Sequence, residues 1–145
     1  MTFGGGSDYN DSRNSGPIGN LIDRQSNLAA LIKMKKAISN YESVTYVYMT
    51  EKSTPQKEVK DLKNFAGQNC ENLDEYFKIV NRNDSCSFTT ADGIYWEFNP
   101  NTGEVTVSDS YDNPTYTLQM GVCEDGTVNC SSRYPEVSEM MNKTS

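Results

Sequence analysis

The sequence contains no histidine and only one tryptophan among its 145 residues. Without histidine, Ser-His and Cys-His nucleophilic systems are excluded, and zinc loses its commonest nitrogen ligand. The chain also has no Cys-x-x-Cys spacing, and no glycine-rich loop stands between a strand and a helix, where a phosphate would be bound. We therefore expect a protein that is not an enzyme and that holds no cofactor.

Long hydrophobic runs are also absent. Apolar residues make up 35% of the chain, and no run approaches the roughly 20 residues of a membrane span or has the form of a signal peptide. This length and apolar fraction suit one modest core. We expect a flexible, glycine-rich leader at 1–19, a single domain at 20–134 and a polar tail at 135–145.

Basic residues are scarce in the second part of the chain. Residues 61–145 carry 5 Lys or Arg against 14 Asp or Glu, whereas residues 1–60 carry 8 against 6. The net charge of the whole chain is −7. A nucleic-acid binder needs a basic surface that displaces counterions, so we expect no nucleic-acid partner.

The 4 cysteines of a chain without histidine favour disulfides over a zinc site. Cys123 and Cys130 flank a turn-rich insert, and a bridge between them would close a terminal hairpin. Cys70 precedes a helix that we predict at 71–81, and the residues after this helix are long enough to bring Cys86 back to its start. We favour these two pairs among the three connectivities that remain open, and they indicate an oxidising compartment.

The only sustained helical periodicity lies between Asn20 and Tyr41. Apolar residues recur there at spacings of three, four and seven, namely Leu21, Leu28, Leu31, Ile32, Ile38 and Tyr41. This pattern predicts an amphipathic helix whose apolar stripe faces a core. Four basic residues lie mostly on the other side of this helix: Arg24, Lys33, Lys35 and Lys36.

Between this helix and the strands, the signals are mixed. The β-branched and aromatic run 44–49 suits either a strand or a continuation of the helix. Thr54 and Pro55 predict a short helix at about 55–66, and Asn69 predicts another at 71–81 that buries Leu73 and Val80 before a polar turn at 81–84.

From Cys86 onward, the period of the pattern changes to two. Apolar alternation separated by turns predicts successive antiparallel strands at 87–90, 94–98, 104–107 and 116–120. Trp96 should be buried on one face, and Tyr95 should point to the other. The fold class is therefore α+β, with the N-terminal helix packed on a three- to four-stranded antiparallel sheet and short helices between them.

Candidate sites in this sheet region give weak signals. Asp92, Glu97 and Glu104 lie near one hairpin, but acidic residues on a solvated strand face explain them as well as catalysis would. Three aspartates in polar loops could supply oxygen ligands for calcium, namely Asp109, Asp112 and Asp125. They lack the spacing of a defined calcium loop, so an ordinary polar loop is the alternative. The aromatic residues Tyr46, Tyr48, Tyr95, Trp96 and Tyr111 could in part form a sugar-binding or adhesive surface.

The order of these elements, with the phrase ADGIYWEFNPNTGEV at 91–105 and a Cys pair near the end, resembles the soluble head of a type IV pilin or of a type II secretion pseudopilin. In that family, a long N-terminal helix has an apolar membrane half and an amphipathic half that packs on an antiparallel sheet. Residues 20–41 would correspond to the second half, and the pair Cys123–Cys130 resembles the family's C-terminal disulfide. The apolar half of the helix is missing from these residues.

The resemblance implies a filament subunit that contacts homologous subunits and is held in the inner membrane by the missing segment before assembly. It would then be extracellular, and the basic residues Arg24, Lys33, Lys35 and Lys36 would meet acidic residues of neighbouring subunits. A helix face that is merely solvated is the alternative for these residues. For the whole chain, the alternative is an exported, disulfide-bonded adhesion or ligand-binding module outside any filament.

Overall fold

A computed structural model describes residues 17–52, 65–67 and 69–144, with side chains at 27–51, 65–67 and 69–144. The elements are α1 (Pro17–Lys52), the 3-10 helix η2 (Leu73–Glu75), β1 (Ile79–Asp84), β2 (Ser87–Thr90), β3 (Tyr95–Asn99), β4 (Glu104–Ser108), β5 (Thr117–Met120) and α3 (Pro135–Asn142). The predicted leader at 1–19 and helix at 55–66 lie largely outside the described residues.

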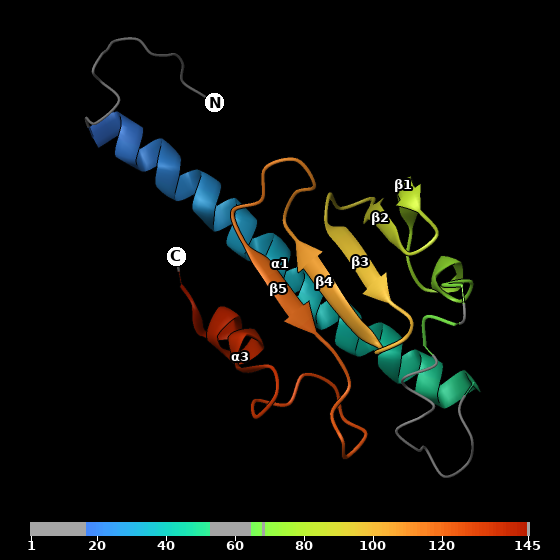
Figure 1. Ribbon diagram of the computed structural model, residues 1–145. Coiled ribbons are helices and arrows are strands. Elements are labelled where there is room, and N and C mark those ends of the chain that lie inside the picture. The colour runs from blue at the N-terminus through green and yellow to red at the C-terminus, as the bar shows by residue number, and fades with distance from the viewer. Residues whose placement is uncertain (1–16, 53–64, 68, 145) are drawn as a thin grey trace.

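The five strands form one antiparallel sheet in the order β1-β2-β3-β4-β5. Helix α1 crosses one face of this sheet, and α3 lies beside the β5 edge (Figure 1). Each strand pairs with its neighbour in sequence, so short turns are sufficient connections. The α+β class is confirmed, and the sheet has one strand more than the predicted upper number of four.

Helix α1 buries a face that differs in part from the predicted stripe. Leu31, Met34 and Ile38 are almost fully buried, with exposed fractions of 1%, 0% and 1%. Leu28 and Ile32, which were expected on the same stripe, are 41% and 59% exposed. The apolar spacing is compatible with more than one buried face of the helix, and the face that packs on the sheet is centred on Met34. The prediction was therefore wrong at these two positions.

The ambiguous run 44–49 belongs to α1, which continues to Lys52. Thr45 is buried, and its hydroxyl donates to the carbonyl oxygen of Tyr41 at 2.8 Å, which satisfies a polar group that would otherwise be costly in the core. Tyr48 packs edge-on against Phe65, with ring centroids 5.4 Å apart. Tertiary packing therefore decides in favour of the helix at these β-branched and aromatic positions.

The predicted helix at 71–81 is wrong. Only Leu73–Glu75 form a 3-10 turn, and β1 occupies Ile79–Asp84, where a polar turn was expected. Val80 is 61% exposed. An edge strand can carry polar, exposed residues because its backbone hydrogen bonds to β2 do not depend on an apolar face.

The inner face of the sheet forms the core with α1. Its apolar side chains are buried in alternate positions of β3, β4 and β5, as predicted for Trp96, whereas β2 adds Phe88 and β1 has no buried residue. The buried side chains are Phe88, Trp96, Phe98, Val105, Val107, Leu118 and Met120. Trp96 pairs with Val107 across β3 and β4, and Val107 pairs with Leu118 across β4 and β5. The alternation leaves the other face of the sheet to solvent.

Part of the predicted polar tail at 135–145 is helical. Helix α3 begins at Pro135, a residue whose fixed backbone angle suits the first helical position. Val137 and Met140, three residues apart, are 4% and 6% exposed. These two side chains dock a short helix whose other positions are mostly polar, apart from Pro135 and the exposed Met141.

Candidate functional site

The lysines predicted for subunit contact bind loops of their own domain. The Lys33 ammonium donates to the carbonyl oxygen of Asp109 at 3.3 Å, and Lys36 forms an ion pair with Asp92 at 3.7 Å. Lys35 donates to the carbonyl oxygen of Lys143. Arg24 lies in α1, but its side chain is outside the described residues. The lysines therefore fasten α1 to a hairpin turn, to the β4–β5 loop and to the end of α3.

The outward face of α1, defined by Leu28, Ile32, Tyr46 and Val47, carries exposed apolar side chains. Leu28 and Tyr46 are 18 residues apart, which is about five turns, so they point in the same direction. Ile32 is 59% exposed and Tyr46 is 73% exposed. Large apolar side chains along one helix face are a common feature of interaction surfaces.

Both disulfides have the pairing that the sequence analysis favours. Cys70 and Cys86 have Cα atoms 5.3 Å apart, and Cys123 and Cys130 have Cα atoms 6.0 Å apart. The first bridge joins the segment before η2 to the β1–β2 turn. The second, which we call the C-terminal disulfide, closes the loop that leads from β5 to α3.

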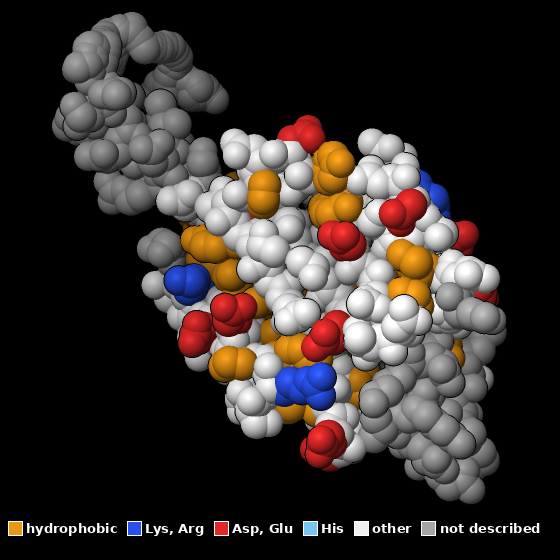
Figure 2. Space-filling view, in the orientation of Figure 1, with side chains coloured by type: hydrophobic (Ala, Val, Ile, Leu, Met, Phe, Trp, Pro, Cys, Tyr) orange, Lys and Arg blue, Asp and Glu red, His pale blue; other side chains and the backbone are white. Residues whose placement is uncertain are grey.

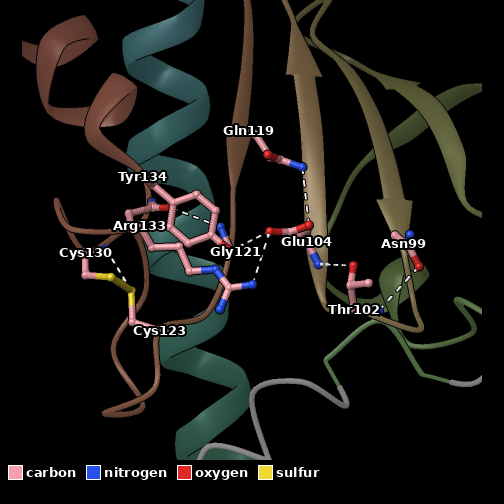
Figure 3. Close-up of polar contacts among 10 residues, drawn as sticks. Asn99, Thr102, Glu104, Gln119, Gly121, Cys123, Cys130, Arg133 and Tyr134 are labelled. Atoms are coloured by element: carbon pink, nitrogen blue, oxygen red, sulfur yellow. Dashed lines mark hydrogen bonds and ion pairs between the residues drawn. A yellow bond between two sulfur atoms is a disulfide. The ribbon is translucent and has the colours of Figure 1, made fainter.

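A polar cluster beside the C-terminal disulfide holds the approach to α3 (Figure 3). The carboxylate of Glu104 on β4 accepts hydrogen bonds from the Tyr134 hydroxyl at 3.0 Å and the Gln119 amide at 3.3 Å, and Arg133 lies 3.7 Å away. Burial and the hydrogen bond to Glu104 raise the pKa of Tyr134 to about 12. We call Glu104, Gly121, Arg133 and Tyr134 the clamp.

Gly121 lets the Tyr134 ring lie directly against the backbone. A Cβ atom at this position would be 2.1 Å from the Tyr134 Oη and 2.7 Å from its Cζ, so no larger residue fits without movement. The backbone of Gly121 is also fixed, because its N–H donates to the Asn129 side chain at 3.3 Å and its carbonyl accepts from the Asn129 N–H at 2.9 Å. The clamp is not evident from the sequence, because its residues come from separate segments and no local pattern connects them.

The three aspartates considered for calcium have different surroundings. The buried carboxylate of Asp109 accepts from the backbone N–H groups of Thr115 and Tyr116 at 2.8 and 2.7 Å, and so closes the β4–β5 loop. Hydrogen bonds from Thr127 lower the pKa of Asp125, and Asp112 is exposed. Among the described residues, no group of three or more His, Cys, Asp or Glu is placed to hold a metal ion.

The three acidic residues near the hairpin are only partly brought together. Glu97 and Glu104 line the same shallow depression on the outer face of the sheet, with a volume of about 430 Å³. Asp92 lies in the β2–β3 turn, where it accepts from the Thr90 hydroxyl at 2.6 Å. Figure 2 shows acidic side chains scattered over this outer face without a single concentrated cluster.

The aromatic residues do not form one surface. Trp96 is fully buried, and Tyr46 is on the outward face of α1. Tyr95 and Tyr111 meet on the outer face of the sheet, with ring centroids 4.8 Å apart, and Tyr111 is 57% exposed. Only this last pair therefore remains as an aromatic patch near the loops.

Comparison with known proteins finds no family model that matches the chain, and no curated protein or solved structure that is significantly similar to it. Within the part of the chain that the structure describes, no helix combines the length and apolarity needed to cross a bilayer. The class that the fold defines is thus an α+β protein with a five-stranded antiparallel meander, a long helix on one face of the sheet and two disulfides.

Proposed function

We propose that this chain is a structural subunit of a type IV pilus or of a related pilus-like filament, with a role in surface adhesion, motility or secretion. The observation that carries the proposal is the arrangement of α1. This helix of 36 residues packs its later turns on the sheet, and its first turns project beyond the sheet edge (Figure 1). A projecting helix of this kind offers a surface along which homologous subunits can pack side by side.

The outward face of α1 supports this proposal. Leu28 and Ile32 are 41% and 59% exposed, and they lie close to the projecting part of the helix. Exposed apolar side chains on one face lose their contact with water when a neighbouring subunit covers them, which favours association. In the assembled filament, the outward face of α1 would be covered by neighbouring subunits, and the outer face of the sheet would be exposed to solvent.

The basic residues of α1 belong to the same proposal. Lys36 keeps 57% of its side chain exposed although it pairs with Asp92, so a carboxylate of a neighbouring subunit can still reach it. Lys33 and Lys35, which are half-buried, and Arg24, whose side chain is outside the described residues, belong to the same proposed contact. Exposed charge pairs of this kind contribute mainly orientation and association rate rather than affinity.

The two disulfides fit a protein that matures in an oxidising compartment. In the proposal, the subunit is held in the inner membrane before assembly, and it is extracellular after assembly. An exported adhesion or ligand-binding module would carry disulfides as well. The pair of Tyr95, which is half-buried, and Tyr111, which is exposed, is the feature that favours this second candidate.

Immunogold electron microscopy of the source cells distinguishes the two candidates. Antibodies raised against the purified domain should label surface filaments, and cells that lack the gene should lose either the filaments or the label. Label that is confined to the cell envelope or to monomeric secreted protein would contradict the filament proposal and favour the module.

Charge reversal tests the basic residues separately. The double substitution Lys35→Glu and Lys36→Glu in the full-length protein should reduce the number of filaments per cell. Lys78→Glu is a matched control, because it reverses an exposed charge at a residue outside α1. Normal filament numbers in the double variant would exclude these lysines from subunit contact.

A further inference from the structure

We propose that the cavity between α1 and the β2–β3 turn is a binding site for a small aromatic carboxylate. The cavity has a volume of about 310 Å³. It is lined on one side by α1 residues, including Lys36 and Asn40, and on the other by Phe77, Lys78 and Asp92. The site shares Lys36 with the proposed subunit contact but lies apart from the clamp, and the proposal does not depend on the function in a filament.

The apolar wall of this cavity is held rigidly by other aromatic rings. The Phe77 ring lies 4.7 Å from that of Trp96 and 5.7 Å from that of Phe88, measured between centroids. The hydroxyl of Tyr76, which also lines the cavity, donates to Glu51 at 3.2 Å, and its ring packs against Tyr48. A wall that is already ordered loses little conformational entropy when a flat ring packs against it.

The charged side chains that line the cavity carry a net positive charge, and Glu51 lies outside the lining, where its carboxylate accepts from the Tyr76 hydroxyl. Lys36 and Lys78 each bring an ammonium group, whereas Asp92 brings the only carboxylate among the lining residues. This carboxylate already accepts from the Thr90 hydroxyl at 2.6 Å and lies 3.7 Å from Lys36. The remaining positive charge belongs to Lys78, whose side chain has no polar partner among the described residues, so a ligand carboxylate would be attracted to it.

The size of the cavity limits the ligand. Binding sites for small molecules range from about 300 to 1,000 Å³ and combine a mostly apolar lining with a few polar groups that set the orientation. A volume of about 310 Å³ is at the low end of that range and suits one aromatic ring with a short carboxylate arm. The ring would lie against Tyr76 and Val44, the half-buried residues of the apolar lining, and the carboxylate would point toward Lys78 and the amide of Asn40.

Titration of the full chain with phenylacetate, followed by NMR, tests this site. The chain has one tryptophan, so one indole N–H signal reports on the cavity. That N–H donates to the Thr90 hydroxyl at 3.1 Å, and both residues line the cavity, so an occupied site should shift the signal. We expect a saturable shift with phenylacetate and clearly weaker binding of phenylacetamide, which has the same shape without the charge.

Two variants locate the binding. Lys78→Gln should weaken phenylacetate binding about fivefold, the size expected when an exposed charge partner is lost, and should leave phenylacetamide unaffected. Ala91→Leu, at an exposed residue of the cavity rim, should block both probes. Lys143→Gln is the matched control and should bind phenylacetate as the parent chain does.

The result that would overturn the proposal is equally defined. An indole signal that does not shift at millimolar phenylacetate, equal binding of the two probes, or unchanged binding by Lys78→Gln would each exclude a carboxylate site here. If Ala91→Leu fails to fold, as judged by loss of cooperative thermal unfolding, Lys78→Gln and the pair of probes still decide the question.

Discussion

The substitution Gly121→Ala tests the clamp most sharply. The new Cβ atom would be 2.1 Å from the Tyr134 Oη and 2.7 Å from its Cζ, so the ring must move away. Movement of the ring also breaks the 3.0 Å hydrogen bond from Tyr134 to Glu104. Overpacking of this kind costs about 1–3 kcal/mol, and a hydrogen bond to a charged group is worth about 1.5–3 kcal/mol. Because the two effects share one ring movement, we expect a total loss of about 2–4 kcal/mol.

Such a loss is a large part of the roughly 5–15 kcal/mol by which a domain is stable, and it should lower Tm by about 10 °C. Thermal and urea unfolding, followed by circular dichroism with both disulfides intact, measure it. The necessary control is Tyr134→Phe, which removes the hydroxyl and its hydrogen bond but introduces no new atom.

The double variant Gly121→Ala with Tyr134→Phe distinguishes a clash from a general loss of stability. With the hydroxyl oxygen gone, the closest contact is removed, so the alanine should cost at least about 1 kcal/mol less than it does in the parent chain. Additive effects of the two substitutions, or a loss below about 0.5 kcal/mol for Gly121→Ala, would refute the close contact between Gly121 and Tyr134.

Three further predictions concern stability. Replacing both cysteines of a disulfide by serine should lower the free energy of unfolding by about 3 kcal/mol for Cys70–Cys86 and by about 2 kcal/mol for the C-terminal disulfide. The first bridge closes the longer loop, since the sequence separations are 16 and 7. A larger loss for the shorter loop in urea unfolding would contradict this order. The Tyr134 pKa of about 12 lies above the ordinary value of 10.0, so its contribution is complete below pH 10 and is lost as pH rises through 12. Tyr134→Phe should therefore make Tm fall less steeply between pH 10 and 12, and an unchanged slope would be evidence against the raised pKa. Met34→Ala should lower the free energy of unfolding by about 2–5 kcal/mol, whereas Ile32→Ala on the outward face should change it by no more than about 0.5 kcal/mol in the isolated domain. Similar losses for the two variants in denaturant unfolding would contradict the assignment of the two helix faces.

Sequence periodicity predicted the central strands well because their inner positions are consistently apolar. Trp96 alternates with exposed or half-buried residues on β3, and Val105 and Val107 do the same on β4. The turn at Gly93 also fits, since its φ of +83° is a conformation that glycine adopts readily. In these strands, the local pattern and the tertiary environment agree.

The edges of the fold were harder to predict. β1 is polar and exposed at Asn81–Asp84, so its sequence matches a turn, and only pairing with β2 makes it a strand. Helix α3 buries just Val137 and Met140, too few apolar positions for a clear period in a short segment. In both cases, contacts with residues distant in sequence determine the structure, and a local pattern does not contain them.

The candidate sites follow the same rule. The pairing of Cys123 with Cys130 could be favoured from the turn-rich insert between them, whereas the pairing of Cys70 with Cys86 was favoured from a helix at 71–81 that the structure does not contain. The partners of Lys33 and Lys36 could not be predicted, since Asp109 and Asp92 are brought to α1 by the sheet. The sequence also did not determine which face of α1 packs on the sheet, and the exposure of Ile32 depends on that face.

The most direct test of the proposed filament subunit is the accessibility of a cysteine at Ile32, on the outward face of α1. In the purified domain, Ile32→Cys should react rapidly with a maleimide, because this position is 59% exposed. In filaments sheared from cells that express the full-length variant, the same cysteine should be protected at least about tenfold, while Asp112→Cys in the exposed β4–β5 loop remains reactive. Equal reactivity of Ile32→Cys in the domain and in the surface fraction would contradict the account.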